Sequence, residues 1–186
     1  MQTAPNWFVI LNVLGFQAVW LAWAWGAPLG QALWPALGSV LFLVLHFAVA
    51  PNKRRDAWAL LLCVGVGAVF DTAMMQSGMI DFALPNPAPL DPVEPFWMLL
   101  LWACLGCTLH TGLAWLQRWP RGTYPISAVF GWLSYEAAHR LGALSLADNA
   151  LCMASLLLFW GVFIPWAQTI SASLAQKAAT DSSTEA

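Results

Sequence analysis

Six ionisable side chains lie within long apolar stretches of this sequence, where a charge needs either a partner or a function. They are His46, Asp71, His110, Glu136, His139 and Arg140. Imidazole and carboxyl groups can transfer protons, and a guanidinium group can hold a carboxylate or a phosphate. A charged side chain at the centre of a bilayer costs about 2.5–3.5 kcal/mol on insertion scales, so it usually faces other helices or water. These six residues are therefore the first candidates for a functional site.

The segment 124–143 carries three of the six. Small side chains cluster on one face of the helix expected there: Ser127, Gly131, Ser134, Ala138 and Gly142. The opposite face has Trp132, Glu136, His139 and Arg140. Small residues let helices approach closely, and a Glu followed four residues later by an Arg can form a neutralising pair. We expect this helix to be central in the bundle, with neither face towards lipid.

Asp71 lies within another apolar segment and shares a helical face with Gly67 and Gly78. At 1.5 Å per residue, its depth is compatible with His139 and Arg140. We therefore expect Asp71, Glu136, His139 and Arg140 to form a catalytic cluster that shuttles a proton, holds a metal or binds an anionic group. The alternative is a structural hydrogen-bonded network.

His46 and His110 are the residues that a metal or a haem would use, because imidazole is a common ligand of both. Cys104 and Cys107 precede His110 at helical spacing and could add thiolate ligands. Cysteine is also a common small buried hydrophobe, and Thr108 stands where covalent haem attachment needs a histidine. The sequence therefore predicts no cofactor. If a metal or a haem is bound, His46 and His110 are its candidate ligands.

The composition indicates a membrane protein. Hydrophobic residues make up 60% of the chain and charged residues 9%, with a mean hydropathy of +0.67, whereas a soluble domain has about 25% charged residues. A net charge of −2 and the lack of a basic stripe argue against a nucleic-acid partner. The sequence has no Walker loop, His-Glu-x-x-His or Gly-x-Ser-x-Gly motif. The two lysines, Lys53 and Lys177, lie outside the apolar segments, so no buried Schiff base can form.

Six apolar segments are long enough to cross a bilayer. They are Trp7–Trp25, Gln31–Ala50, Ala57–Met79, Phe96–Gln117, Tyr124–Ala143 and Ala150–Ile170. The sequence thus predicts an all-α polytopic membrane protein, with one transmembrane domain over residues 1–174 and a disordered cytoplasmic tail over 175–186. Within these segments Trp20, Trp102, Trp132 and Trp160 lie deep enough to line a pocket for a flat or acyl ligand.

The cations indicate the orientation of the chain. In a six-span topology the cations outside the apolar segments fall on one side: Lys53, Arg54, Arg55, Arg118, Arg121 and Lys177. By the positive-inside rule that side is cytoplasmic, together with both termini. The connection 80–94 carries Asp81, Asp91 and Glu94 and no cation. We expect it outside, where it is large enough to act as a lid.

Several short motifs resemble an uncharacterised bacterial inner-membrane family catalogued as domain of unknown function 2878. They are Asn12, Phe16-Gln17 and Trp20, His46, Arg54-Arg55-Asp56, Asp71, Gly78, Trp97, Leu100–Trp102, Thr108-Leu109, Tyr135 and Arg140–Ala143. The resemblance covers roughly residues 7–166 and implies a multi-pass protein of the inner (cytoplasmic) membrane. It also favours a lipid-linked role, because members often lie near genes for lipid-modifying enzymes.

The first functional hypothesis is a lipid or fatty-acyl modifying enzyme, or an accessory factor, whose partners are membrane lipids and an acyl or other amphiphilic ligand. A second is a small proton-coupled transporter, which with six spans would favour a homo-oligomer. A third is a structural or assembly partner, in which the polar residues only set the helix register.

Overall fold

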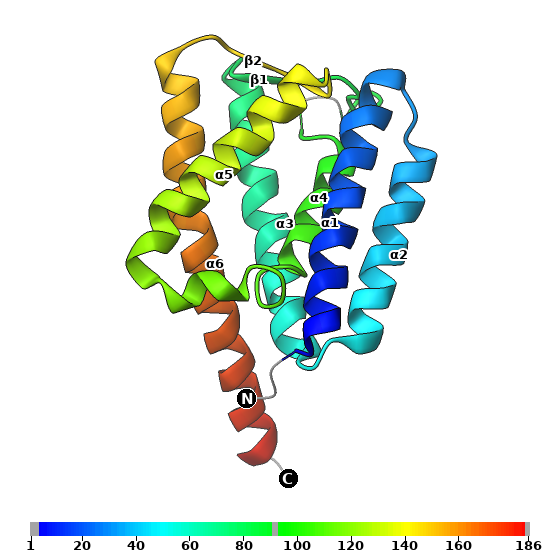
Figure 1. Ribbon diagram of the computed structural model, residues 1–186. Coiled ribbons are helices and arrows are strands. Elements are labelled where there is room, and N and C mark those ends of the chain that lie inside the picture. Colours follow the sequence, from blue (N-terminus) through cyan, green and yellow to red (C-terminus); the bar gives the residue numbers. More distant parts are fainter. Residues whose placement is uncertain (1–3, 91–92, 185–186) are drawn as a thin grey trace.

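The computed structural model describes residues 4–90 and 93–184, and it is almost entirely helical (Figure 1). Six α-helices run alternately up and down the bundle: α1 (Asn6–Gly26), α2 (Leu33–Val49), α3 (Lys53–Gln76), α4 (Phe96–Gly106), α5 (Pro120–Arg140) and α6 (Ala150–Thr184). Short 3₁₀ helices follow α1 and precede α5, namely η1 (Ala27–Leu29) and η2 (Ala114–Arg118). The prediction that the chain is predominantly helical is confirmed.

Three helices among the described residues are long and apolar enough to cross a membrane: Asn6–Leu29, Lys53–Gln76 and Ala150–Thr180. The helices Leu33–Val49 and Phe96–Gly106 are apolar but shorter. Large apolar side chains point outward from several helices, and Leu33, Val69 and Leu158 are each more than 70% exposed. Such an extensive apolar surface fits contact with lipid rather than with water.

The predicted fourth segment, Phe96–Gln117, is not one continuous helix. α4 ends at Gly106, and residues 107–113 form successive turns before η2 begins. Gly106 packs directly on the backbone of Leu60 in α3, where a side chain would not fit. Residues 102–110 are all buried, so the break in the helix lies inside the bundle. Its backbone groups must therefore find partners other than water.

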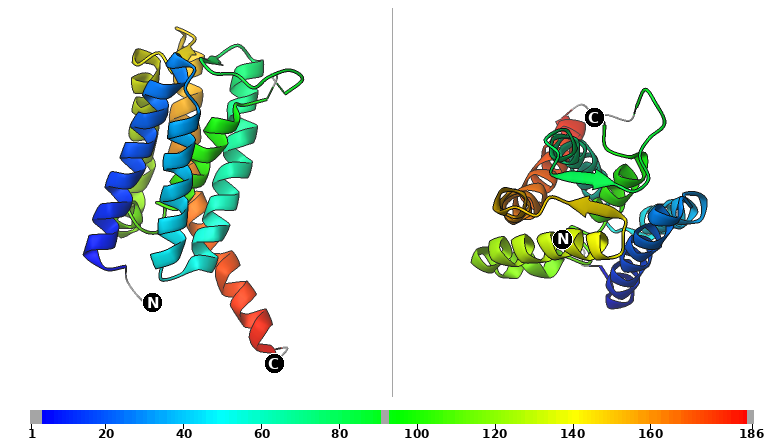
Figure 2. Two further views of the ribbon diagram at one scale, coloured as in Figure 1. Left: turned by 90° about the vertical axis from the view of Figure 1, so that its right-hand side faces the viewer. Right: turned by 90° about the horizontal axis from the view of Figure 1, so that it is seen from above.

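The helices pack as an open ring in the order α5, α6, α3, α4, α2, α1, and α4 also touches α1. The view from above in Figure 2 shows α5 and α1 as the two ends of this ring. The small face of α5 packs on α6, with Gly131 directly against the ring of Trp160. The prediction that this helix is central is wrong, because α5 packs chiefly on α6 and leaves Phe130 67% exposed. The central position belongs to α4.

A two-stranded antiparallel sheet closes one end of the bundle. Strands β1 (Ile80–Phe82) and β2 (Leu144–Leu146) pair with Ile80 opposite Leu146, and residues 80, 82 and 144 are buried. The loop after β1 is held in place by Asn86, which donates to the Glu94 carbonyl (2.9 Å) and accepts from the Phe96 N–H (2.9 Å). Part of the predicted lid is therefore fixed to the bundle. Asp91 lies outside the described residues.

The described part of the predicted disordered tail is helical. α6 continues past residue 175 to Thr184, well beyond the predicted end of the sixth segment. Alanine, which favours helix most strongly, occurs three times between residues 175 and 179. The polar composition of this stretch, from which the disordered tail was predicted, is therefore compatible with a helix.

A pair of glycines on α3 tests the packing of α3 on α4. Gly67→Ala is expected to destabilise the protein by about 1–3 kcal/mol, as overpacking does, because the added methyl group would overlap the ring of Trp102. The matched control is Gly65→Ala, two residues earlier, where no atom lies within 4 Å. Thermal unfolding in detergent measures both, and equal melting temperatures would contradict this packing.

Candidate functional site

Asp71 occupies an enclosed polar position between three helices. Its side chain, on α3, has no exposed surface. The indole Nε1–H of Trp102 in α4 donates to Oδ2 (2.8 Å), and the hydroxyl of Tyr135 in α5 donates to Oδ1 (2.7 Å). Each carboxylate oxygen thus has a donor, which is what a buried carboxylate requires.

Packing holds the two donors in position. The ring of Trp102 lies over Gly67, one turn before Asp71, and stacks on Trp160 of α6 at 5.1 Å between centroids. The ring of Tyr135 meets Trp160 edge-on at 6.1 Å. Because Trp160 packs on both rings, it helps to hold the two hydrogen-bond donors to Asp71 in position.

A second carboxyl group faces Asp71. Glu94 precedes α4, is 3% exposed, and its backbone N–H donates to the hydroxyl of Thr72 (3.0 Å). Within the described residues neither of its carboxylate oxygens has a hydrogen-bond donor. Burial, and then the negative charge of Asp71, raise the pKa of Glu94 to about 9. Glu94 is therefore neutral at pH 7, and as a protonated acid it can donate to Asp71.

A groove of about 710 Å³ opens between α1 and α5, with α4 at its back. Its walls are mainly apolar and aromatic and include Val13, Phe16, Trp20, Leu101, Trp102, Leu105, Phe130, Tyr135, Trp160 and Ile164. The volume falls in the range of about 300–1,000 Å³ that is typical of small-ligand sites. Because Trp102 and Tyr135 belong to both, the Asp71 site forms part of the groove wall. Of the four deep tryptophans that the sequence suggested for a pocket, all but Trp132 line this groove.

The predicted cluster of Asp71 with Glu136, His139 and Arg140 is not formed. Glu136 pairs with Arg140 (2.8 Å), whose side chain is 76% exposed. His139 accepts a hydrogen bond from the backbone N–H of Leu146 (3.4 Å) and so lies against β2. These three residues lie at the C-terminal end of α5, whereas Asp71 is bound by Tyr135. A catalytic role for any of the four stays a prediction.

Sequence reasoning missed the actual partners of Asp71, namely Trp102, Tyr135 and Glu94. In an apolar segment, a tyrosine and a tryptophan look like ordinary packing residues. Glu94 was placed in the predicted connection 80–94, outside the apolar segments. One signal was available: Tyr135 is one of only two tyrosines in the chain, and it lies on the small face of its helix, where a phenol needs a partner when buried.

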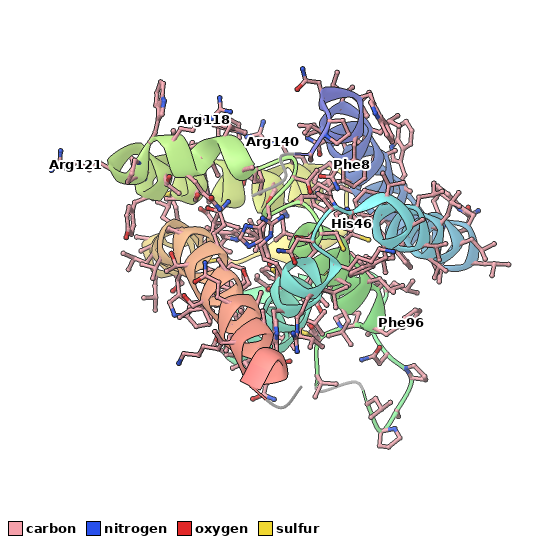
Figure 3. The ribbon with its side chains drawn as sticks, turned by 90° about the horizontal axis from the view of Figure 1, so that it is seen from below. Phe8, His46, Phe96, Arg118, Arg121 and Arg140 are labelled. Carbon is pink, nitrogen blue, oxygen red and sulfur yellow. The ribbon has the colours of Figure 1, made fainter. Side chains whose placement is uncertain are left out.

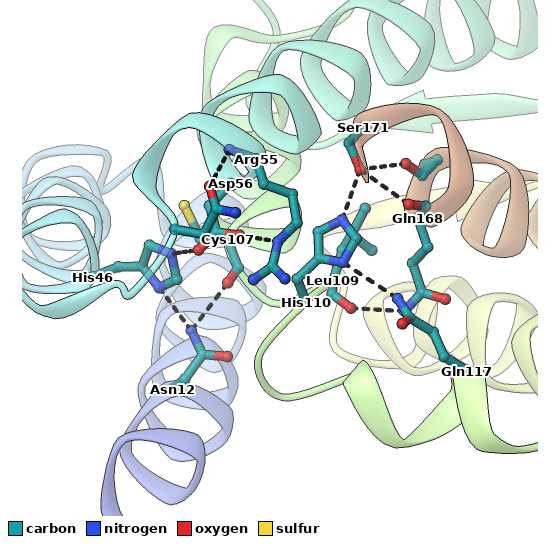
Figure 4. A network of polar contacts seen from close by, with 12 residues as sticks. Asn12, His46, Arg55, Asp56, Cys107, Leu109, His110, Gln117, Gln168 and Ser171 are labelled. Carbon is teal, nitrogen blue, oxygen red and sulfur yellow. Dashed lines mark hydrogen bonds and ion pairs between the residues drawn. The ribbon is translucent and has the colours of Figure 1, made fainter. Parts of the chain in front are cut away.

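A second polar network lies at the other end of the bundle (Figure 4). His46 Nε2 is 3.2 Å from Oδ2 of Asp56, whose Oδ1 accepts from Arg55 Nε (3.2 Å). The other ring nitrogen of His46 is 3.2 Å from Asn12 Nδ2. All but Arg55 are at least 97% buried. This network connects α1, α2 and the start of α3.

The same network holds the broken segment 107–113. Asn12 donates to the Cys107 carbonyl (3.3 Å) and accepts from the Gly112 N–H (3.1 Å). From α6, Gln168 donates to the carbonyls of Leu109 (2.7 Å) and Leu113 (3.1 Å). These amide side chains therefore provide the partners that the helix break requires.

His110 belongs to this part of the bundle. Its Nε2 lies 2.7 Å from the Ser171 hydroxyl and its Nδ1 3.2 Å from Gln117 Nε2. Both ring nitrogens of His110, like both of His46, thus have protein partners. In the described part of the chain, no three His, Cys, Asp or Glu side chains gather as a metal site. The four cysteines are buried free thiols.

Comparisons with known proteins agree with the resemblance noted in the sequence. A family model described as "Protein of unknown function (DUF2878)" matches residues 9–166. No curated protein and no solved structure matches the chain. The motifs on which the resemblance rests include Asn12, His46, Asp71, Trp102 and Tyr135, all of which belong to the two polar networks described above.

The network around Asp56 is expected to stabilise the fold. Asp56→Asn should lower the free energy of unfolding by about 3–5 kcal/mol, because removing one partner of a buried ion pair leaves the other uncompensated. The matched control is Glu136→Gln, which breaks the exposed pair with Arg140 and should cost no more than about 1 kcal/mol. Thermal unfolding in detergent compares the two, and a wild-type melting temperature for Asp56→Asn is the contrary result.

Proposed function

The chain belongs to the DUF2878 family of proteins of unknown function, and we propose that it binds an acyl chain or a similar amphiphile within the membrane. The observation that carries this proposal is the groove between α1 and α5, with the Asp71-bound hydroxyl of Tyr135 in its wall. The protein would act as a lipid-modifying enzyme or as an accessory factor of one.

The membrane arrangement that goes with this proposal has six crossing segments in the inner membrane. The fourth consists of α4 and the turns 107–113. The start of α1 and the end of α6 lie at the same end of the bundle, as does the start of α3 with Lys53, Arg54 and Arg55 (Figure 1). Figure 3, viewed from that end, shows Arg118 and Arg121 projecting outward from the edge of the bundle. The positive-inside rule assigns this end to the cytoplasm.

The position of the groove supports an amphiphilic ligand. Its lining includes exposed residues of both flanking helices, such as Val13 of α1 and Phe130 of α5, so it opens sideways between them. A ligand dissolved in the bilayer could enter without crossing water. Apolar walls suit an acyl chain, whose burial contributes about 0.8 kcal/mol per CH₂ group.

Tyr135 is the residue best placed for chemistry on such a ligand. Its hydroxyl donates to Asp71, which leaves the lone pairs of the phenol oxygen available to the groove. Tyrosine can act as a general acid or base when its proton has a positioned partner. The Asp71–Tyr135 hydrogen bond is such an arrangement, and it favours an enzyme over a purely structural protein.

Proton-coupled transport is the second candidate, and the break in the fourth segment is the observation that favours it. Discontinuous helices form the binding sites of many transporters. In this structure the carbonyls of Cys107, Leu109 and Leu113 are already bonded to Asn12 and Gln168. The broken segment therefore has fewer acceptors to offer a substrate, and we place transport second.

Photo-crosslinking tests the groove. A diazirine-labelled palmitic acid, added to the purified protein in detergent, is expected to label groove residues such as Leu105. Val13→Trp should reduce this labelling several-fold, because Val13 lines the groove and the larger ring would occupy it. Mass spectrometry of the labelled peptides measures the outcome.

The matched control for this experiment is Val44→Trp. Val44 is an exposed residue of α2 that is not part of the groove, so the same substitution should leave the labelling unchanged. Uniform labelling of all outward-facing helix surfaces, with no effect of Val13→Trp, would refute an acyl site in the groove.

The lipid composition of a strain that lacks this protein tests its cellular role. We expect its fatty-acyl profile to differ from that of the parent, and the wild-type chain to restore it. Tyr135→Phe, which keeps the ring and removes the hydroxyl, should fail to restore it although the protein is present in the membrane. Restoration by Tyr135→Phe would count against a chemical role for the hydroxyl, and an unchanged profile under several stresses would count against a lipid role altogether.

A further inference from the structure

The surroundings of the buried Glu94 side chain favour its protonated form over the ionised carboxylate. Both carboxylate oxygens are buried, and no donor group in the described part of the chain binds either of them. A buried carboxylate without donors carries a large desolvation penalty, so such a group takes up a proton instead. The position of Glu94 therefore selects the neutral acid.

Asp71, which faces Glu94, is in the opposite situation. Its two oxygens accept the hydrogen bonds of Trp102 and Tyr135, which favour the anion. Two facing carboxyl groups, one with two donors and one with none, share a single proton most stably when it resides on the group without donors. The O–H of Glu94 then serves as a third donor to Asp71.

Few other groups influence this pair. From α5, the titratable group in contact is Tyr135, and from α4 the indole N–H of Trp102 faces the pair. The ion pairs found among the described residues do not include Asp71 or Glu94. Among the residues that the structure describes, no cation is therefore paired with Asp71 or Glu94 in place of the shared proton.

We propose that Glu94 and Asp71 hold one proton between them and pass it, through the hydroxyl of Tyr135, to a ligand in the groove. The delivery step rests on the proposed function, whereas the stored proton does not. In that step the Tyr135 hydroxyl turns towards the ligand and gives up its proton. Glu94 then transfers its proton to Asp71, and Asp71 passes that proton on to the phenol oxygen. The ligand gains one proton and the carboxyl pair loses one, leaving a second negative charge on the pair.

This assigns a role to a residue that neither the sequence patterns nor the apolar segments indicated. Glu94 is a proton donor that acts through two other residues, and it is therefore a positioning and supply group rather than one that touches the ligand. The loop that carries it is fixed to α3 by Thr72 and to the start of α4 by Asn86. Both anchors keep the Glu94 carboxyl beside Asp71.

Infrared spectroscopy of the purified full-length protein tests the stored proton without any ligand. At pH 7 the wild type should show the carbonyl band of a protonated carboxylic acid, and this band should disappear as the pH is raised through about 9, the value to which burial and Asp71 raise the pKa of Glu94. Glu94→Gln should abolish the band. Asp71→Asn should retain it but shift its loss to lower pH, because the neighbouring negative charge is gone.

The control variant is Glu136→Gln, which removes a carboxyl group from the same end of the protein and should leave the band unchanged. Tryptophan fluorescence and size-exclusion chromatography show whether each variant is folded. Absence of a protonated-carboxyl band at pH 7 in the wild type would overturn the stored proton, and so would a band that persists in folded Glu94→Gln.

Hydrogen–deuterium exchange of the same band tests the route through Tyr135. After transfer into D₂O, the band should shift more slowly in Tyr135→Phe than in the wild type, because the hydroxyl that connects the pair to the groove is missing. An unchanged exchange rate would overturn the route. The binding of palmitic acid is measured separately by crosslinking, so failure of the acyl site and failure of the proton store give different results.

Discussion

A polar group inside an apolar bundle must have a partner, and the position of Asp71 shows how far this constraint shapes the protein. Its carboxylate is satisfied only if α4 supplies the indole of Trp102 and α5 supplies the hydroxyl of Tyr135. Trp102 can approach because Gly67 has no side chain, and α5 is brought within reach by the close contact of Gly131 with Trp160. Three helices are thereby placed around one acidic residue.

The same constraint explains the other end of the bundle. The break after Gly106 exposes backbone groups that no lipid or water can satisfy, and the side chains of Asn12 and Gln168 bind them instead. Asn12 is in turn linked to the buried pair of His46 and Asp56. Irregular backbone is tolerated within an apolar bundle only where protein groups surround it, and here they come from α1 and α6. Both histidines that could have been metal ligands take part in this support.

Between these two ends, the open side of the helix ring leaves the groove. α5 packs chiefly on α6 rather than between other helices, so its second face remains free to line a cavity shared with α1. Tyr135 lines this cavity, and its hydroxyl binds the buried Asp71. The arrangement joins a polar site to an apolar chamber that opens sideways, and this combination is the basis of the proposed lipid-linked role.

The sequence by itself determined the helices, since long apolar segments with few breakers allow little else, and it singled out Asp71 because a charge in such a segment needs a reason. It also located the small face of α5, because a 3.6-residue period is a local property. The sequence could not determine which residue of α5 binds Asp71. Glu136 and Tyr135 are adjacent in the chain and differ by only 100° around the helix. A modest rotation of α5 therefore decides which of the two contacts α3. The contact of Gly131 with Trp160 is compatible with one such rotation only, and α4 ends at Gly106, which packs on Leu60. Only the tertiary structure decided these points, because contacts between residues far apart in the chain depend on how whole helices pack and not on any local pattern.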